Sequence, residues 1–436
     1  MDRSKRPVLR GTQIGAGCLV RWHDGTGRAV LQAWVQLLVG GGLSFVANAV
    51  SIVILTRYLP VKQFGELALA QTAVSAVAFV GRLGLVSWGE REIAQTGSVG
   101  SVEVVVRLRL ALTAVAEGIL FAAVWVCVRD HAVGAIYGVL AVGAIGYSMT
   151  VDWALIVVQD SRGVGALRFA RGLSILAMTV IWALWDRSSV VGASTVIAAG
   201  DVLFAVATVV RLNPWRARVS MRYSGLIVMR KSMPFAVIHS IGLLWNADVF
   251  LVRWLAGDQG VALYSLAKRL AGIAHNVIVR LVTSVAPEVN RIGRSDAQGV
   301  VTIVRQWASV ILGAGLAICS VYAVAMYFGV VSVLAPKYSG LGPVIFGLVV
   351  WAVFSSVATL VSTGLGALGM ERKTVWGAIA GGSACVLGTA VLVPFMGPMG
   401  AAISLVIAEL AAIGVLWRQL MQRTKVYVYQ VRGFPS

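Results

Sequence analysis

The stretch LYSLAKRLAGIAHNVIVRLVTSVAP, residues 263–287, combines the length of a membrane span with internal positive charge. It is long and apolar enough for a membrane-spanning helix, which needs about 20 mostly apolar residues, yet it holds Lys268, Arg269, His275 and Arg280. A Lys or Arg that faces lipid near the bilayer centre costs about 2.5 to 3.5 kcal/mol. These cations must therefore reach water, a counter-charge or the membrane surface. The stretch predicts a spanning helix with one polar side.

The composition extends this interpretation to the whole chain. Hydrophobic residues make up 58% and charged residues 13% of the 436 residues, and the mean hydropathy is +0.84, which excludes a water-soluble globular protein. We predict an all-α integral membrane protein with about twelve transmembrane helices, one for each apolar run of spanning length. The expected spans cover residues 30–56, 65–88, 109–128, 132–157, 164–185, 190–210, 229–255, 261–287, 306–335, 342–367, 374–394 and 398–417.

The distribution of basic residues predicts the topology. The chain has 37 Lys and Arg against 18 Asp and Glu, a net charge of +19. With both termini cytoplasmic, most of these cations fall in the basic tails 1–29 and 419–436 and in the loops on the same side. The loops on the other side hold only Arg57, Lys62, Arg129, Arg187, Arg253 and Lys337. This positive-inside pattern predicts a multi-pass protein with both termini in the cytoplasm and no nucleic-acid partner. Its basic face is expected to contact anionic membrane lipids.

A weak internal repeat divides the spans into two halves. RYLPVKQ at 57–63 and RWLAGDQ at 253–259 mark the ends of the first and seventh spans, and they match in Arg, an aromatic residue, Leu and Gln. Because an even number of spans returns the chain to the same side, the halves form a parallel repeat, as in several transporter folds. We predict an N-terminal six-helix bundle over 30–222 and a C-terminal six-helix bundle over 223–418, related by a parallel pseudo-two-fold axis.

Motifs that would indicate an enzyme or a cofactor site are weak. GLGALG, 364–369, fits a dinucleotide-binding pattern but closes a predicted span with no strand before it, so close helix packing explains its glycines better. The four cysteines lack the paired spacing of a metal site. No nucleophile has a base at useful spacing. We predict a transporter rather than an enzyme, with no cofactor and no metal.

Several short motifs, taken in order, resemble one transporter family. They are ILTRYLPVKQFGELALA and LGLVSWGEREIA in the first two spans, DWALIVVQDSR closing the fourth, KSMPFAVIHSIGLLWNADVFLVRWLAGDQGVALYSLAKRL opening the second half, and GLGALGMERK ending the tenth. Together they make the chain similar to Wzx-type polysaccharide or O-antigen precursor flippases, within the multidrug, oligosaccharidyl-lipid and polysaccharide (MOP) exporter superfamily. Arg82 departs from the family pattern, in which a polar or acidic residue is expected before Leu-Gly-Leu.

The resemblance implies a MATE-like fold and a function. The expected cargo is an oligosaccharide on a polyprenyl pyrophosphate, moved from the inner to the outer leaflet of the bacterial plasma (inner) membrane by alternating access between the bundles. A glycan polymerase and a chain-length regulator are implied as partners. Three alternatives stay open: a cation-coupled multidrug exporter, a lipid II flippase, whose relatives usually carry two further C-terminal spans, and a non-transporting scaffold of a glycan assembly complex.

The polar side of the 263–287 helix supplies the candidate cargo site. At about 100° per residue, Arg269, Asn276 and Arg280 share one stripe, and Lys268 and His275 form a second stripe about 100° away. The two stripes predict one wide wet face, in which the cations hold the pyrophosphate. The competing interpretation is that the long side chains snorkel from both ends of the helix to the membrane surface.

Other polar residues inside the spans are further candidates. Arg82, in the second span, is a candidate ligand for the cargo. Glu117, Asp201, Asp248 and Glu409 are intramembrane carboxylates that balance the cations. Glu117, Asp248, Asp201 and His275 are candidates for ion or proton coupling. Structural ion pairs explain the carboxylates about as well, and His275 is more often a helix-packing residue than a proton carrier.

Overall fold

The structure is nearly all helical. The computed structural model describes residue 42 and residues 44–82, 84–96, 101–128, 130–157, 161–187, 189–212, 224–293, 296–334 and 336–432, and these contain no strand. The helices are Ser44–Tyr58, α2 Val61–Arg82, α3 Leu85–Thr96, α4 Val102–Cys127, α5 His131–Ser148, α6 Asp152–Val157, α7 Ser161–Trp185, α8 Val190–Leu212, α9 Gly225–Ile241, the 3-10 helix η3 Gly242–Asn246, α10 Ala247–Gly293, α11 Ala297–Met326, the π-helix η4 Tyr327–Val331, α12 Ser332–Leu334, α13 Leu341–Ala367, α14 Glu371–Met396 and α15 Pro398–Arg432.

Nine helical segments in the described ranges are long and apolar enough to cross a membrane. One of them, Leu244–Gly293, covers two predicted spans, because Gly257 adopts a positive φ of 70° and turns the chain back on itself. α2 occupies the second predicted span. The first predicted span, 30–56, begins outside the described residues and continues in the Ser44–Tyr58 helix. These segments account for a multi-pass membrane protein.

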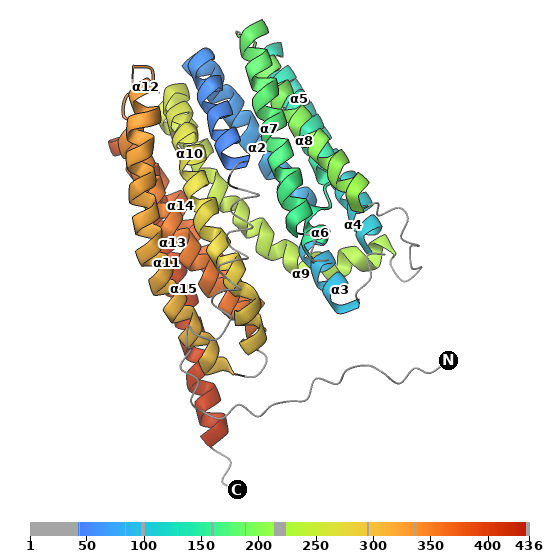
Figure 1. Cartoon of the computed structure of the whole chain (residues 1–436), viewed down its shortest axis with the longest axis vertical. Helices are drawn as coiled ribbons and strands as arrows, with labels where there is room; N and C mark the ends of the chain where they lie inside the picture. Colours follow the sequence, from blue (N-terminus) through green and yellow to red (C-terminus); the bar gives the residue numbers. More distant parts are fainter. Residues whose placement is uncertain are drawn as a thin grey trace.

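Four predicted spans are not single helices in the described residues. The fourth, 132–157, is divided into α5 and α6, and the ninth, 306–335, continues from α11 through η4 into α12. The second, 65–88, ends at Arg82, because Gly84 turns the chain with a φ of 69° before α3 begins. The seventh, 229–255, is divided into α9, η3 and the start of α10. α9 runs crosswise at the lower end of the first bundle and reaches the second bundle near its mid-height (Figure 1), contacting α3 and α4 on one side and α14 on the other. It therefore links the two groups of upright helices.

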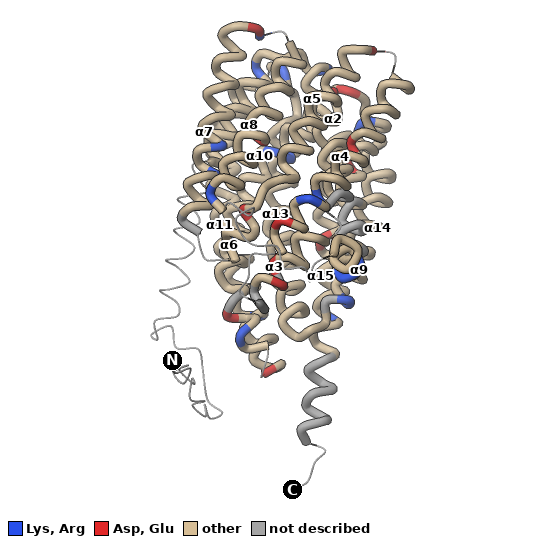
Figure 2. The backbone as a smooth tube through the Cα atoms, turned by 90° about the vertical axis from the view of Figure 1, so that its right-hand side faces the viewer, with Lys and Arg blue, Asp and Glu red and all other residues tan. Residues whose placement is uncertain are grey.

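The upright helices form two bundles (Figure 1). The first bundle contains the Ser44–Tyr58 helix, which packs at Ser44 against Gly172 of α7, together with α2, α4, α5, α7 and α8. The second bundle contains α10, α11, α13, α14 and α15. Figure 2 shows that charged residues lie at mid-height of the helices as well as near their ends. The predicted bounds 30–222 and 223–418, and the two tails, stay predictions.

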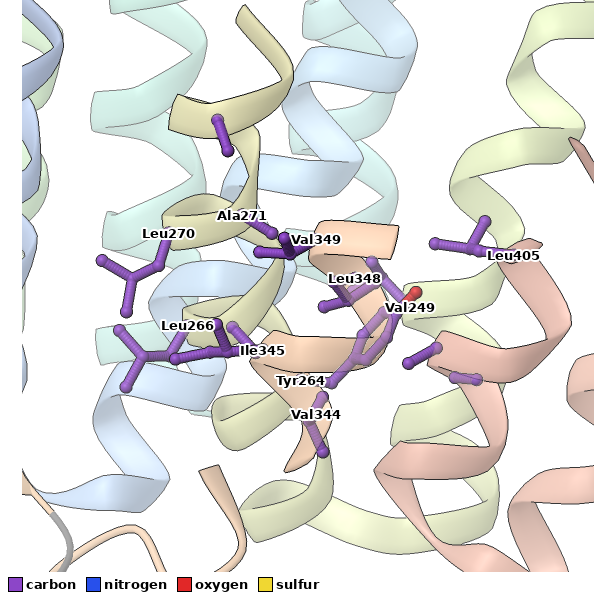
Figure 3. Close-up of a cluster of buried hydrophobic side chains, with 14 of the residues drawn as sticks. Val249, Tyr264, Leu266, Leu270, Ala271, Val344, Ile345, Leu348, Val349 and Leu405 are labelled. Carbon is purple, nitrogen blue, oxygen red and sulfur yellow. The ribbon is translucent and has the colours of Figure 1, made fainter. Parts of the chain in front are cut away.

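Packing on α13 and α15 fixes the orientation of α10. Figure 3 shows a cluster of buried side chains around this contact, in which Leu266 and Leu270 point away from α13 and α15; its labelled members are Val249, Tyr264, Leu266, Leu270 and Ala271 of α10, Val344, Ile345, Leu348 and Val349 of α13, and Leu405 of α15. Within a bilayer, close van der Waals contact rather than exclusion of water holds such helices together. This contact sets the rotation of α10 and thereby the direction of its polar side chains.

The two bundles contact each other along α2 and α10 near the upper end of Figure 1, where α12 lies. Gly65 of α2 is so close to α10 that a Cβ atom there would lie 2.8 Å from the carbonyl oxygen of Asp258. The ring of Phe64 meets that of Tyr338 edge-on, with centroids 6.4 Å apart, and both side chains are buried. A bulkier residue at Gly65 would therefore push the bundles apart.

Lys337, in the loop before α13, adds a polar contact at the same end. Its ammonium donates to the backbone carbonyls of Thr56, at 2.7 Å, and Leu59, where the Ser44–Tyr58 helix ends. The last carbonyls of a helix lack partners within the helix, and a cation there is favourable. Burial lowers the pKa of the Lys337 ammonium from its ordinary value. We call the Lys337, Phe64–Tyr338 and Gly65–Asp258 contacts the upper contacts.

Candidate functional site

A cavity of about 550 Å³ lies between the two bundles. Helices α2, α5, α7 and α8 line it from the first bundle, and η3 and α10 line it from the second bundle and its linker. Its polar lining residues are Gln71, Thr72, Ser75, Tyr147, Arg171, Asp201, Asn246 and Arg269. Sites for small ligands measure about 300 to 1,000 Å³ and place a few polar groups among apolar walls. This cavity is the candidate functional site.

Arg269 of α10, one of the residues of the predicted polar stripe, lines this cavity. Its guanidinium donates to Oε1 of Gln71 on α2, and its Cζ lies 5.6 Å from the centre of the Phe64 ring. No carboxylate of the described residues lies within salt-bridge distance of Arg269. Because Gln71 is neutral, the positive charge of Arg269 is available to an anion in the cavity.

Arg171 of α7 provides a second cation, which is already paired. It forms a salt bridge with Asp201 of α8. Its Cζ also lies 5.9 Å from the centre of the Tyr147 ring and 5.6 Å from that of Phe204, within the range of cation–π attraction. Asp201, a candidate for ion coupling, therefore faces the cavity with its charge neutralised by Arg171.

Lys268 points away from the cavity, contrary to the predicted wide wet face. Its ammonium donates to Oδ2 of Asp248 at 2.6 Å, and the Tyr264 hydroxyl donates to the same oxygen. Asp248 is fully buried, and its Oδ1 accepts from the backbone N–H of Val249 at 2.7 Å. These bonds lie within α10, between the segments on either side of Gly257. They make Lys268 a partner of Asp248 rather than a lining residue.

The other two polar residues of the stripes also have partners within the second bundle. The Nδ1 atom of His275 lies 3.3 Å from the Ala352 carbonyl, and its ring stacks on Trp351 with centroids 5.1 Å apart. The Asn276 amide donates to the Gly272 carbonyl one turn earlier, at 2.7 Å. Neither residue lines the cavity. Of the predicted wet face, Arg269 lines the cavity. Lys268 and His275, which form the second stripe, have partners within the second bundle, and Asn276 bonds to its own helix.

Arg280 lies outside the cavity lining, nearer the lower end of α10. It is close enough to Arg168 of α7 and Asp152 of α6 for their charges to act on it, although those residues belong to the other half of the chain. Arg168 and Asp152 are joined by a salt bridge of 2.8 Å. Arg82 ends α2, and its side chain lies outside what the structure describes. Roles for Arg280 and Arg82 in cargo binding stay predictions.

The remaining carboxylates differ in their surroundings. Glu409 accepts a hydrogen bond of 3.1 Å from the Trp351 indole. Glu117 of α4 is buried, and neither of its carboxylate oxygens has a hydrogen-bond partner among the described residues. Among the residues that the structure describes, no three His, Cys, Asp or Glu side chains are placed to hold a metal ion. Ion coupling through Glu117 stays a prediction.

Six polar residues of the described lining were missed by sequence reasoning. Three of them interact with a charged residue of the site, namely Arg171, Gln71 and Tyr147, and the others are Thr72, Ser75 and Asn246. Arg171 follows Arg168 by one helical turn in RFARGLS, inside the predicted fifth span, and this spacing was an available signal. Gln71 is a polar residue in the otherwise apolar run LALAQTAVS. Tyr147 carries no signal of its own, because an aromatic residue within a span more often packs than lines a cavity.

Comparison with known proteins defines the class of fold. No protein-family model matches the chain, and no curated protein matches it in sequence. An outward-facing multidrug resistance MATE family transporter of the MOP superfamily superposes with a TM-score of 0.69 and 16% identity, over 92% of this chain and 96% of its own. A MOP superfamily transporter from Pyrococcus furiosus gives a TM-score of 0.69 and 16% identity, over 91% of this chain and 96% of its own. A Vibrio cholerae MATE transporter mutant gives a TM-score of 0.61 and 14% identity, over 91% of this chain and 98% of its own.

The fold is that of the MATE-like membrane transporters of the MOP superfamily. The predicted fold class, an all-α membrane protein with two bundles of MATE-like arrangement, is confirmed, and the chain is a multi-pass membrane protein. These neighbours are transporters rather than enzymes. At 14% to 16% identity they define the fold alone, so the cargo has to be inferred from the cavity.

Proposed function

We propose that the chain is a flippase for a polyprenyl-pyrophosphate-linked oligosaccharide, a precursor of a surface polysaccharide. It would carry this lipid from the inner to the outer leaflet of the bacterial plasma membrane by alternating access. The pyrophosphate and first sugars occupy the cavity, and the polyprenyl tail remains in the lipid. A glycan polymerase and a chain-length regulator are the expected partners.

The charge of the cavity is the observation that carries the proposal. Among its described lining residues, Asp201 is neutralised by Arg171, whereas Arg269 bonds only to the neutral Gln71. The lining therefore holds one net positive charge. A cation about 4 Å from a phosphate contributes on the order of 4 kcal/mol at an effective dielectric near 20. Arg can also bind a phosphate through two parallel N–H donors. An anionic head group suits this site.

A cation-coupled drug exporter is the second candidate, favoured by the multidrug transporters among the fold neighbours. Such a cargo needs an acidic cavity, and the one carboxylate in the described lining is already paired. Cavity polarity also varies on this fold, since the reverse polarity of the binding pocket in the Pyrococcus furiosus neighbour suggests a different function for that protein. The net positive lining therefore favours the anionic cargo.

The test compares the two cargo classes with full-length protein in proteoliposomes. One cargo is a fluorescent short-chain polyprenyl-pyrophosphate sugar, whose leaflet is read with a membrane-impermeant quencher, and the other is ethidium. We expect protein-dependent movement of the lipid and none of ethidium. Movement of ethidium alone would replace the flippase with the exporter.

Replacing Asp201 with Asn separates the two candidates further. The change leaves Arg171 without its counter-charge and adds one positive charge to the cavity. For an anionic cargo, affinity should be kept or rise several-fold, because Coulomb attraction to the head group increases. For a cationic cargo, transport should fall at least tenfold. Cargo binding to the purified variant measures the direction, and the nearly isosteric Ser75→Ala change in the same lining serves as a neutral control.

The charge distribution predicts that both termini are cytoplasmic, and the lower end of α15 in Figure 1 is then on the cytoplasmic side. Alkaline phosphatase fused after Arg187 or Lys337, at the opposite end, should be active outside the cytoplasm, and a fusion at the C-terminus should be inactive. Green fluorescent protein fused at the C-terminus should be bright, as the reciprocal control. Phosphatase activity at the C-terminus would overturn the topology.

A further inference from the structure

We propose that Arg269 couples binding of the anionic cargo to opening of the upper end, with Gln71 and Phe64 as its positioning residues. The inference rests on the proposed function, because it needs an anion in the cavity. In the structure, Arg269 lines the cavity and also forms a hydrogen bond between the two bundles. The cargo and the first bundle therefore compete for one guanidinium.

The contacts of Arg269 join it to the upper contacts. From the second bundle it reaches Gln71 and the Phe64 ring, both on α2 of the first bundle. Phe64 in turn packs edge-on against Tyr338 of the second bundle. The side chains of Arg269, Phe64 and Tyr338 form a continuous path from the cavity to the buried contact at the upper end. An anion that binds the Arg269 guanidinium competes with Gln71, which lines the same cavity.

An anion should make that movement favourable. Gln71 offers Arg269 a single neutral oxygen, whereas a pyrophosphate offers several charged oxygens that match its paired N–H donors. A ligand shifts a conformational equilibrium only if it binds one state more tightly. Here the state with the upper end open binds the anion more tightly, because Arg269 is then free of Gln71. The more tightly the cargo binds Arg269, the further it should shift the equilibrium toward the state with the upper end open.

Two substitutions at Gln71 should have effects of opposite sign. Gln71→Ala removes the competitor and should raise the affinity for inorganic pyrophosphate roughly threefold to tenfold, the effect of one hydrogen bond. Gln71→Glu supplies a charged partner and should lower that affinity about tenfold or more. A residue that served only helix packing would not give this reversal. Gln306→Ala is the matched control, since Gln306 is an exposed glutamine of α11 outside the cavity and the upper contacts.

The experiment uses the full chain in nanodiscs with spin labels at Lys62 and Gln259, exposed positions on α2 and α10 near the upper end. Pyrophosphate binding is measured by calorimetry and the label separation by double electron–electron resonance. We expect pyrophosphate to lengthen the separation in the native chain and in Gln306→Ala. Gln71→Ala should show the longer separation without ligand. Gln71→Glu and Arg269→Ala should not respond to pyrophosphate.

The outcomes distinguish the coupling from the proposed function. Binding with an unchanged separation overturns the coupling and leaves the anion site standing. Affinity changes of the same sign in Gln71→Ala and Gln71→Glu also overturn the coupling. If the native chain does not bind pyrophosphate, the anionic site of the proposed function fails, and the coupling fails with it.

Discussion

Replacing Arg269 with Ala is expected to stop export of the lipid-linked glycan while the protein remains folded and inserted. Arg269 is the unpaired cation in the described cavity lining, and a close phosphate interaction contributes on the order of 4 kcal/mol. Its loss should lower transport by about two to three orders of magnitude. Arg269→Lys should keep part of the activity, because a point charge remains without the bidentate fork. Arg269→Gln should keep little.

The measurement uses a strain that lacks the gene. Each variant is expressed, its membrane level is confirmed, and surface glycan is measured together with precursor trapped on the inner leaflet. Arg291→Ala is the matched control, because Arg291 is an exposed arginine on the same helix, paired with Glu288 outside the cavity. Arg280→Ala, predicted from the same stripe to block export, is tested in parallel. Normal export by Arg269→Ala would remove the cavity assignment.

The largest expected loss of stability follows from replacing Asp248 with Ala. The change leaves the Lys268 ammonium without the carboxylate that it contacts at 2.6 Å and leaves the buried Tyr264 hydroxyl without its acceptor. Breaking one side of a buried ion pair costs about 3 to 5 kcal/mol, because the remaining charge is uncompensated. The double change Asp248→Ala with Lys268→Met should recover most of that loss, since it removes both charges.

Thermal unfolding in detergent checks this prediction, and transport by the stable double variant decides what the pair is for. Export by the double variant would show that Asp248 and Lys268 form a structural ion pair. A stable double variant without export would assign them to ion coupling. If the single change leaves the melting temperature unaltered, the pair contributes nothing to the fold and the energetic argument is wrong.

The 263–287 stretch shows which placements the sequence predicts and which it does not. The helical period placed Arg269 on a polar side, and the structure finds it in the cavity. The same period put Lys268 on an adjoining wet stripe, because nothing in the period reveals a partner elsewhere. Asp248 and Lys268 are 20 residues apart and would be about 30 Å apart on a straight helix. The turn at Gly257 brings them into contact, and a glycine within an apolar run does not predict a turn by itself.

Arg171 shows a different limit. It lies near the start of a predicted span, where an arginine is usually explained by the membrane surface. Its role depends on Asp201 and Tyr147, which belong to two other helices and reach the same cavity only when the bundle is assembled. Apolar periodicity predicts which segments become helices, whereas the pairing of charges between helices depends on their packing. The sequence therefore predicts the positive charge of the candidate site but not the full set of residues that line it.

The contact of Lys337 with backbone carbonyls has an evolutionary consequence. Every amino acid presents the same carbonyl, so substitutions of Thr56, Arg57 or Leu59 leave the acceptors in place, whereas a change of Lys337 removes the donor. Mutational tolerance should therefore be one-sided. In a saturation library selected for export, position 57 should accept many side chains, while position 337 should accept little beyond the two long basic residues.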